Sequence, residues 1–170
     1  HREIIHDPHG VVLIIAAWYY PLRLAASGVA GALLAGNTVL LKHSTRTLSI
    51  GEHFEKAFGA NHILQHVVMD HETTAKLIEE EDINHVVFTG SVAGGEKIYG
   101  STAKRQFDCN LDLGGKDGAY VAPDADIVQS AALLVDGAMY NSGQCCCGFE
   151  LGYVHEKVYD EFLTACRPLL

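Results

Sequence analysis

Residues 10–42 read GVVLIIAAWYYPLRLAASGVAGALLAGNTVLLK, which has the order strand, helix, strand. Residues 11–15 are all apolar and mostly β-branched, as in a strand that is buried within a sheet. A helix is predicted over residues 21–35, because a proline stands at its first position and Gly-Asn follows its end. Residues 38–41 form a second apolar run. The stretch therefore predicts a βαβ unit with parallel strands.

The same alternation continues along the chain. Further strands are predicted at residues 64–68 and 85–89, and further helices at 47–58, at 72–80 and from Gly90-Ser91 to about residue 100. After residue 108 the pattern changes to short strands at 110–113 and 119–121, a helix from 123 to about 139, and a strand beginning at 152. The prediction is an α/β fold: a doubly wound, Rossmann-like parallel sheet that continues into the start of a second α/β domain, with the boundary after residue 111.

The composition excludes several classes of protein. Of the 170 residues, 48% are hydrophobic and 19% are charged, as in a globular chain rather than a disordered one. The formal net charge is −9, and the only basic pair, Lys104-Arg105, is interpreted as a solvated helix end. These features argue against nucleic-acid binding. The longest apolar run, residues 11–20, has about half the length of a membrane span.

The cysteines and the chain ends lead to two expectations. Five cysteines, three of them consecutive, do not form a regular disulfide framework, so we expect a reducing, cytoplasmic environment. The chain begins at His1 without an initiator methionine and ends at Leu170 within a predicted helix end. We therefore expect it to be a piece of a longer protein.

The segment Asn141-Ser142-Gly143-Gln144-Cys145-Cys146-Cys147 carries the strongest chemical signal. A thiol that follows a glycine-containing turn can lie beside backbone amides, which favour the thiolate and so a nucleophile. The alternative is that these cysteines are small buried hydrophobic residues, the commonest role of a free cysteine. The triplet alone does not decide between the two.

Three further signals are individually weak. The first is the segment Asp112-Leu113-Gly114-Gly115-Lys116. Its carboxylate could act as a general base, and its glycines allow close approach of the backbone. A tight turn with a solvated Asp would look the same. Phe88-Thr89-Gly90-Ser91 ends a strand and opens a helix, where amide groups favour a pyrophosphate, but it could be an ordinary βα turn. Lys42 at a strand end could reach a nucleotide, or could simply be solvated.

The ten histidines do not indicate a metal site. His62 and His66 are expected on one face of the strand at residues 64–68, at some distance from each other. No acidic or cysteine residue completes a ligand set beside them. We predict no metal ion.

Taken together, the order and spacing of these stretches resemble the aldehyde dehydrogenase superfamily over nearly the whole chain. The matching stretches are Trp18-Tyr19-Tyr20-Pro21, the segment from Ala35 to Lys42, Phe88-Thr89-Gly90-Ser91, Leu113-Gly114-Gly115-Lys116 and Gly143-Gln144-Cys145-Cys146. The resemblance implies NAD- or NADP-dependent oxidation of an aldehyde to an acid, in a protein that is a homo-oligomer at full length. It also implies that residues 1–111 are part of the dinucleotide-binding domain and that residues 112–170 begin the catalytic domain.

The resemblance also implies roles for individual residues. Cys146 would attack the aldehyde to form a thiohemiacetal, which becomes a thioester and is released by water. Asp112 would be the general base, and Tyr19 would occupy the position of the oxyanion donor. The expected cofactor-binding residues are Trp18, Lys42, Thr45, Gly90, Ser91, Gly95, Leu113 and Gly114.

Three of these positions depart from the family pattern. Where the family has Asn, Glu and Glu, this chain has Tyr19, Asp112 and Thr45. Loss of an oxyanion donor typically removes roughly 3–4 kcal/mol of transition-state stabilisation. Thr45 is compatible with NADP, because a carboxylate there would repel a 2′-phosphate. The alternative hypothesis is therefore a degenerate homologue that binds nucleotide or serves a structural role, and a third hypothesis is slow esterase or acyl-transfer chemistry at Cys146.

Overall fold

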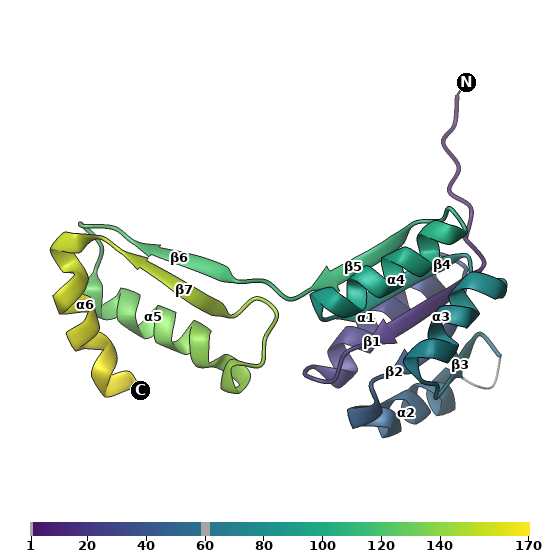
Figure 1. The fold of residues 1–170 in the computed structure, drawn as a ribbon, viewed down its shortest axis with the longest axis horizontal. Coiled ribbons are helices and arrows are strands. Elements are labelled where there is room, and N and C mark those ends of the chain that lie inside the picture. The colour runs from purple at the N-terminus through teal and green to yellow at the C-terminus, as the bar shows by residue number, and fades with distance from the viewer. Residues whose placement is uncertain (1, 59–61) are drawn as a thin grey trace. The chain divides into compact units, whose positions relative to one another are not determined.

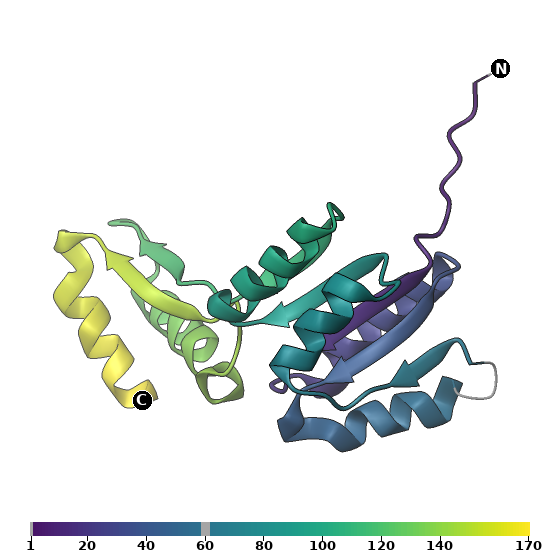
Figure 2. The same ribbon diagram turned by 45° about the vertical axis from the view of Figure 1, so that its right-hand side comes forward.

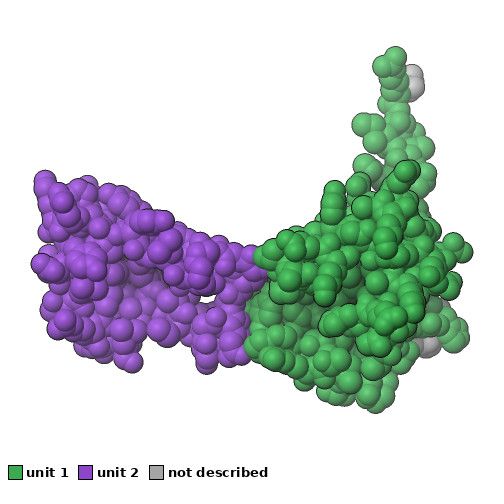
Figure 3. All heavy atoms as spheres, viewed as in Figure 1, with its two compact units in different colours: residues 1–113 green, residues 114–170 purple. Residues whose placement is uncertain are grey.

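The computed structural model describes residues 2–58 and 62–170, which form two compact units, 1–113 and 114–170 (Figure 3). The predicted boundary after residue 111 falls inside a strand that stays paired with its neighbour as far as Leu113. The division therefore lies after Leu113. Assignment of the two parts as cofactor-binding and catalytic domains stays a prediction.

The first unit is built on a five-stranded parallel sheet, which confirms the predicted fold class (Figures 1 and 2). The strand order is β3-β2-β1-β4-β5, in which the chain moves outward from β1 first on one side and then on the other, as in doubly wound folds. Its elements are β1 (Val11–Ala16), α1 (Pro21–Leu34), β2 (Thr38–His43), α2 (Leu48–Phe58), β3 (Leu64–His66), α3 (His71–Glu80), β4 (His85–Gly90), α4 (Val92–Lys104) and β5 (Cys109–Leu113).

Alternating side chains of the sheet belong to two separate hydrophobic cores, one on each face. Val12 and Ile14 of β1 pack with α1 and α2 on one face, whereas Leu13 and Ile15 pack with α3 and α4 on the other. This follows from the two-residue period of a strand. Because both faces are covered by helices, β1 is apolar throughout, as its sequence predicts.

The second unit is a smaller α/β layer. It contains β6 (Asp117–Val121), α5 (Ile127–Met139), β7 (Phe149–Val154) and α6 (Tyr159–Cys166). The two strands pair in parallel, and the helices cover a core of Val121, Ile127, Ala131, Val158 and Phe162. Helix α5 begins at Ile127 rather than at residue 123, because Asp126 is its N-cap and accepts a hydrogen bond from the Gln129 amide at 3.0 Å.

Several predicted bounds are wrong by a few residues. Helix α4 runs to Lys104 rather than about residue 100, β7 begins at Phe149 rather than 152, and β3 ends at His66 rather than 68. His62 lies before β3 with a left-handed φ of 53°, so it does not share a strand face with His66. Within the described residues, every helix is too short or too polar to cross a membrane.

Candidate cofactor and catalytic sites

A cavity of about 600 Å³ opens at the carboxyl ends of β1, β2 and β4, between α3 and α4. Ile15, Lys42 and Phe88 line it, and they are side by side because Ile15 is in register with Lys42 on one neighbouring strand and with Phe88 on the other. Residues of α3 and of the whole length of α4, from Ala93 to Lys104, form the walls. Ligands of open α/β sheets bind at this edge, beside the strand where the direction of winding reverses.

Lys42 is the buried one among the basic residues that line this cavity. It is only 5% exposed, so the interpretation as a solvated strand-end lysine is wrong. Burial lowers the pKa of its ammonium group, and the nearby negative charge of Asp70 opposes that shift. Asp70 is itself fixed as the N-cap of α3, where its carboxylate accepts a hydrogen bond from the Thr73 amide at 2.7 Å. The cavity thus contains a cation that is held away from bulk water.

The turn from β4 to α4 brings the backbone close to the cavity. Ser91 is the N-cap of α4, and its hydroxyl accepts a hydrogen bond from the Gly94 amide at 3.1 Å. A Cβ atom at Gly95 would lie 2.6 Å from Cδ2 of Leu113, and one at Gly90 would lie 2.6 Å from the Phe88 ring. Neither site can accept a side chain unless its neighbour moves. The glycines therefore allow α4 to pack directly on β4 and β5, with its N-terminus at the strand ends.

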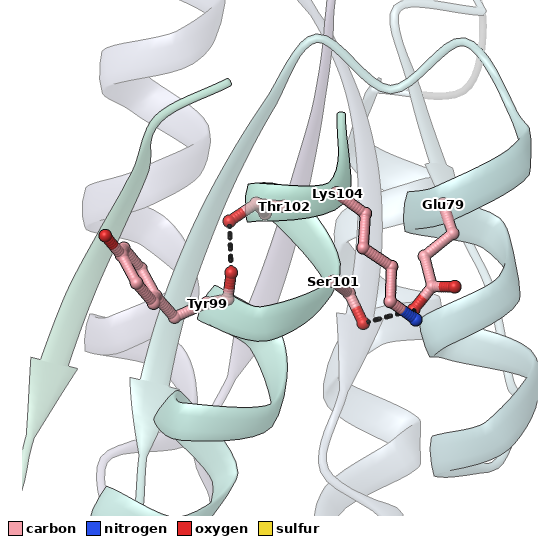
Figure 4. A network of polar contacts seen from close by, with 5 residues as sticks. All are labelled: Glu79, Tyr99, Ser101, Thr102 and Lys104. Atoms are coloured by element: carbon pink, nitrogen blue, oxygen red, sulfur yellow. Dashed lines mark hydrogen bonds and ion pairs between the residues drawn. The ribbon is translucent and has the colours of Figure 1, made fainter. Parts of the chain in front are cut away.

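The far end of the same helix carries a polar network (Figure 4). Lys104 Nζ lies 2.7 Å from a carboxylate oxygen of Glu79, and the Ser101 hydroxyl donates to the same oxygen at 2.9 Å. These two hydrogen bonds, that of Lys104 first, lower the pKa of Glu79. Arg105 donates to the carbonyl groups of Ile78, Glu81 and Ile83. Lys104 and Arg105 are exposed at the end of α4, as interpreted from the sequence, and their side chains also join α4 to α3.

An aromatic loop follows β1. Trp18 is 36% exposed, and the Arg46 guanidinium lies 4.8 Å from its ring centre. The Tyr19 ring meets that of Trp18 edge-on at 6.1 Å and that of Tyr20 at 5.5 Å. Tyr19 is therefore the middle ring of an edge-to-face aromatic cluster. Thr45 begins the 3₁₀ turn Thr45–Thr47 after β2.

The second unit contains the cysteine triplet. Asn141 and Ser142 have φ values of 51° and 60°, and Gly143 has 72°, so three consecutive residues are in the left-handed region. Cys146 is half-buried and Cys147 is exposed. The hydrogen bond between Cys147 and Cys145, followed by the charges of Cys145 and Cys146, raises the pKa of Cys147. A Cβ atom at Gly115 would lie 3.6 Å from the Cys146 carbonyl oxygen, so the glycine pair contacts the cysteine loop.

The comparisons with known proteins agree with this geometry. Residues 1–168 match the model of the aldehyde dehydrogenase family. This chain belongs to the aldehyde dehydrogenase family. An aldehyde dehydrogenase of Paenarthrobacter nicotinovorans is 39% identical over 160 residues, which are 92% of this chain and 35% of that protein. A D-glyceraldehyde dehydrogenase (NADP(+)) of Thermoplasma acidophilum is 32% identical over 96% of this chain and 35% of its own length.

Solved structures give the same result. A lactaldehyde dehydrogenase from Escherichia coli has a TM-score of 0.90 and 33% identity, covering 96% of this chain and 35% of that one. An NADP-dependent glyceraldehyde-3-phosphate dehydrogenase from Bacillus halodurans, complexed with NADP, has a TM-score of 0.88 and 34% identity over the same shares. The chain thus spans about a third of the length of the relatives it matches. The family is one of NAD(P)-dependent oxidoreductases that act on aldehydes.

The structure brings together some of the residues expected to form the sites of this family. Lys42 and Ser91 line one cavity, and Gly90 and Gly95 pack the helix whose N-terminus borders it. Asp112 is exposed on β5, paired in register with Thr89, and Leu113 packs against α4. Thr45 is not among the residues that line the cavity. Gly114 and Cys146 belong to the second unit.

Sequence reasoning missed two supporting residues. His43 is buried, and its ring links the Pro21 carbonyl, at 3.0 Å from Nε2, to the Thr47 hydroxyl, at 2.9 Å from Nδ1. A carbonyl oxygen can only accept, so Nε2 carries the proton in the neutral ring. Nothing in the sequence marks this contact. Asp70 could have been found, because an acidic residue before a helical segment is a typical N-cap signal.

Proposed function

We propose that this chain provides the cofactor pocket and the nucleophile of an NAD(P)-dependent aldehyde dehydrogenase that oxidises an aldehyde to a carboxylic acid. The observation that carries the proposal is the cavity at the strand ends, which the buried Lys42 lines. A cation is costly to bury without a partner, so an anionic or strongly hydrogen-bonding ligand in this cavity would stabilise it. That the whole protein is a cytoplasmic homo-oligomer remains a prediction.

The cavity suits the adenosine half of NAD(P). A volume of about 600 Å³ is typical of small-molecule sites. The Lys42 ammonium would donate hydrogen bonds to ribose oxygens, and the amide groups at the start of α4 would face the pyrophosphate. The bound cofactor would supply a hydride acceptor. The task of unit 1 is therefore to fix the adenosine end, so that the reactive end is presented in one orientation.

In the second unit, the proposed nucleophile is Cys146. Its thiolate would add to the carbonyl carbon of the aldehyde to give a thiohemiacetal. Loss of hydride from that carbon leaves a thioester, and water then attacks the thioester to release the acid and regenerate the thiol. Asp112 would take a proton from the attacking water. Tyr19 could donate a hydrogen bond to the carbonyl oxygen, but its ring packs edge-on against those of Trp18 and Tyr20.

A second candidate function is a homologue that binds nucleotide but does no redox chemistry. The observation that favours it is Tyr19, because a phenol packed edge-on against Trp18 is a larger and differently placed donor than the Asn of the family pattern. Asp112 favours the same candidate, since its carboxylate is one methylene shorter than that of Glu and is less well placed to act as the base. This homologue would retain the cavity and lose turnover.

Binding of adenine nucleotides tests the cofactor pocket. We expect 5′-AMP and ADP-ribose to bind this chain in calorimetric titrations, and Lys42→Met to weaken binding at least tenfold, about 1.4 kcal/mol. Lys56→Met is the matched control, because Lys56 is exposed on α2. If AMP fails to bind, or binds the Lys42 variant as tightly as the original chain, the pocket assignment is wrong.

The charges around the cavity favour NADP within this proposal. Lys42, Lys97, Lys104 and His71 line it, and Lys104 is already paired with Glu79. A 2′-phosphate would add negative charge among these groups, so adenosine 2′,5′-bisphosphate should bind more tightly than 5′-AMP. Equal affinity of the two nucleotides would leave the pocket in place and remove the preference for NADP.

The nucleophile is tested by mass spectrometry after exposure of the chain to an activated ester. An acyl adduct on Cys146 that is absent from Cys146→Ser supports the nucleophile, whereas labelling of Cys147 alone contradicts it.

We expect no NAD(P)H production from the 170-residue chain with a panel of aldehydes, because it spans only about a third of the length of its relatives. In a full-length protein, Tyr19→Asn with Asp112→Glu should raise the rate if the enzyme is impaired at these positions.

A further inference from the structure

The cysteine loop places three sulfur atoms in a small volume. The Sγ atoms of Cys145 and Cys147 lie 3.4 Å apart, and all three sulfurs of the triplet lie within 4.8 Å of one another. Among the residues that the structure describes, this is the only group of three or more His, Cys, Asp or Glu side chains close enough to hold one metal ion. The proposed chemistry uses one of these thiols and assigns no role to the other two.

The backbone of the loop explains why the side chains converge. Three consecutive left-handed residues, Asn141 to Gly143, turn the chain sharply before the triplet. The Asn141 side chain donates to the Gln144 carbonyl, and the Gln144 side chain donates to the Asn141 carbonyl, each at 3.1 Å. On the other side, the Gly148 amide donates to the Cys145 carbonyl at 3.4 Å. The loop is thus fixed at both ends by its own hydrogen bonds.

We propose that Cys145, Cys146 and Cys147 form a binding site for a thiophilic divalent cation of the zinc group. A Zn–S bond is about 2.3 Å long, so three thiolates around one ion have their sulfurs about 3.8–4.0 Å apart. The triplet already spans this range, from 3.4 Å to at most 4.8 Å. Small rotations of the side chains are therefore enough to bring all three sulfurs onto one ion.

The site offers three thiolate ligands and leaves one coordination position free. Each thiol releases its proton as its sulfur binds the ion, so three protons leave and the complex with a divalent cation carries one negative charge. The fourth position of a tetrahedral ion would be taken by water, as in zinc sites with three protein ligands. Cys147 is exposed and the other two are half-buried, so an ion can enter from solvent.

Such an ion would compete with an aldehyde for the Cys146 sulfur. A thiolate that donates its lone pair to a metal is a poor nucleophile toward carbon, so the bound ion would block acylation of Cys146 until it is removed by a chelator. The metal site itself does not depend on the proposed function. Only its inhibitory effect does, and metal binding and acylation can be measured separately.

The test uses the whole chain in a phosphine reductant, with Cd²⁺ as a spectroscopic probe and Zn²⁺ in competition. We expect one equivalent of Cd²⁺ to give an ultraviolet thiolate charge-transfer band that one equivalent of Zn²⁺ removes. Because loss of even an outer-shell partner weakens metal sites about 10–100-fold, Cys147→Ser should weaken Cd²⁺ binding at least about tenfold. The control is Cys109→Ser with Cys166→Ser, which keeps the triplet and should leave the affinity unchanged.

A second measurement needs no variant. Zn²⁺ should slow alkylation of all three triplet thiols by iodoacetamide, followed by peptide mass spectrometry, and leave the rate at Cys166 unchanged. Absence of the charge-transfer band, unchanged affinity in Cys147→Ser, or equal protection of Cys166 would each overturn the proposal. If the ion binds and Cys146 is never acylated by an ester in its absence, the metal site stands and the nucleophile does not.

Discussion

Gly51 is the residue at which packing constrains the sequence of α2 most tightly. It is buried against the ring of His66 on β3, and an added Cβ atom would overlap that ring. Glycine is otherwise a poor helix residue. Gly51→Ala should therefore lower the free energy of unfolding of unit 1 by about 1–3 kcal/mol, the usual effect of overpacking, in urea denaturation.

Gly31 in α1 provides the matched control. It is exposed, and a Cβ atom there would meet nothing within 4 Å. Gly31→Ala should raise the stability by about 0.5–1 kcal/mol, because alanine is the better helix residue. Equal effects of the two substitutions would mean that His66 does not pack on α2 as described.

His66 also makes stability depend on pH. Burial lowers its pKa below the ordinary value of 6.5, with Glu55 and Glu52 opposing the shift and His43 adding to it. The unfolded chain then binds a proton more readily than the folded chain, so stability should fall as the pH drops through and below about 6.5. Thermal denaturation between pH 5 and pH 8 should show this fall, and His66→Asn should reduce it. The exposed His53→Asn is the control, and an unchanged slope in the His66 variant would exclude this source.

At the scale of elements, the contact between α3 and α4 depends more on Arg105 than on the adjacent Lys104. Lys104 is 63% exposed and bonds one carboxylate, whereas Arg105 donates to three backbone carbonyl groups at and after the end of α3. Exposed ion pairs contribute about 0–1 kcal/mol, but carbonyl groups that lose a charged donor are more costly to leave unpaired, at about 1–3 kcal/mol. Arg105→Ala should therefore destabilise the chain more than Lys104→Ala.

Hydrogen exchange gives a readout specific to this contact. Arg105→Ala should increase exchange of amides in the last turn of α3, and Lys104→Ala should have little effect there. Because Lys104 lines the cavity, its removal should instead weaken binding of adenosine 2′,5′-bisphosphate. The reverse pattern would show that the ion pair, and not the arginine, holds the two helices together.

At the scale of the whole molecule, the two units have separate hydrophobic cores, so we predict that they unfold independently of each other. Unit 2 has its own core around Phe162, and the single tryptophan of the chain, Trp18, lies in unit 1. Phe162→Ala should destabilise unit 2 by about 3–5 kcal/mol. Tryptophan fluorescence, which reports on unit 1, should keep its urea midpoint, while the circular dichroism of the chain loses part of its helical signal at lower urea.

A shared midpoint for both signals in Phe162→Ala would show that the two units unfold as one. Val128→Ala is the control, because Val128 is exposed on α5 of the same unit and its truncation should move neither signal by more than about 0.5 kcal/mol. A small unit buries a smaller share of its surface, so unit 2 should be the less stable of the two in the original chain.

The sequence by itself determined the fold class, because the alternation of apolar strands and helical segments admits few arrangements. It also identified Lys42, the Gly90 turn and Cys146 as candidates, through residue type and order along the chain. Element ends were less accurate. Helix α4 continues to Lys104 because contacts to α3 hold its last turn. One of these is the pair of Lys104 with Glu79, which are 25 positions apart along the chain.

Tertiary structure alone decided which of these candidates meet. Lys42 is buried because the register of three strands places it beside Ile15 and in one row with Phe88, and no local signal contains that register. The sequence predicted a nucleophile in the triplet and no metal ion, and the distances between the three sulfur atoms are known only from the structure. The sequence specifies the residue types directly, whereas the distances between residues depend on how the folded backbone brings distant segments together.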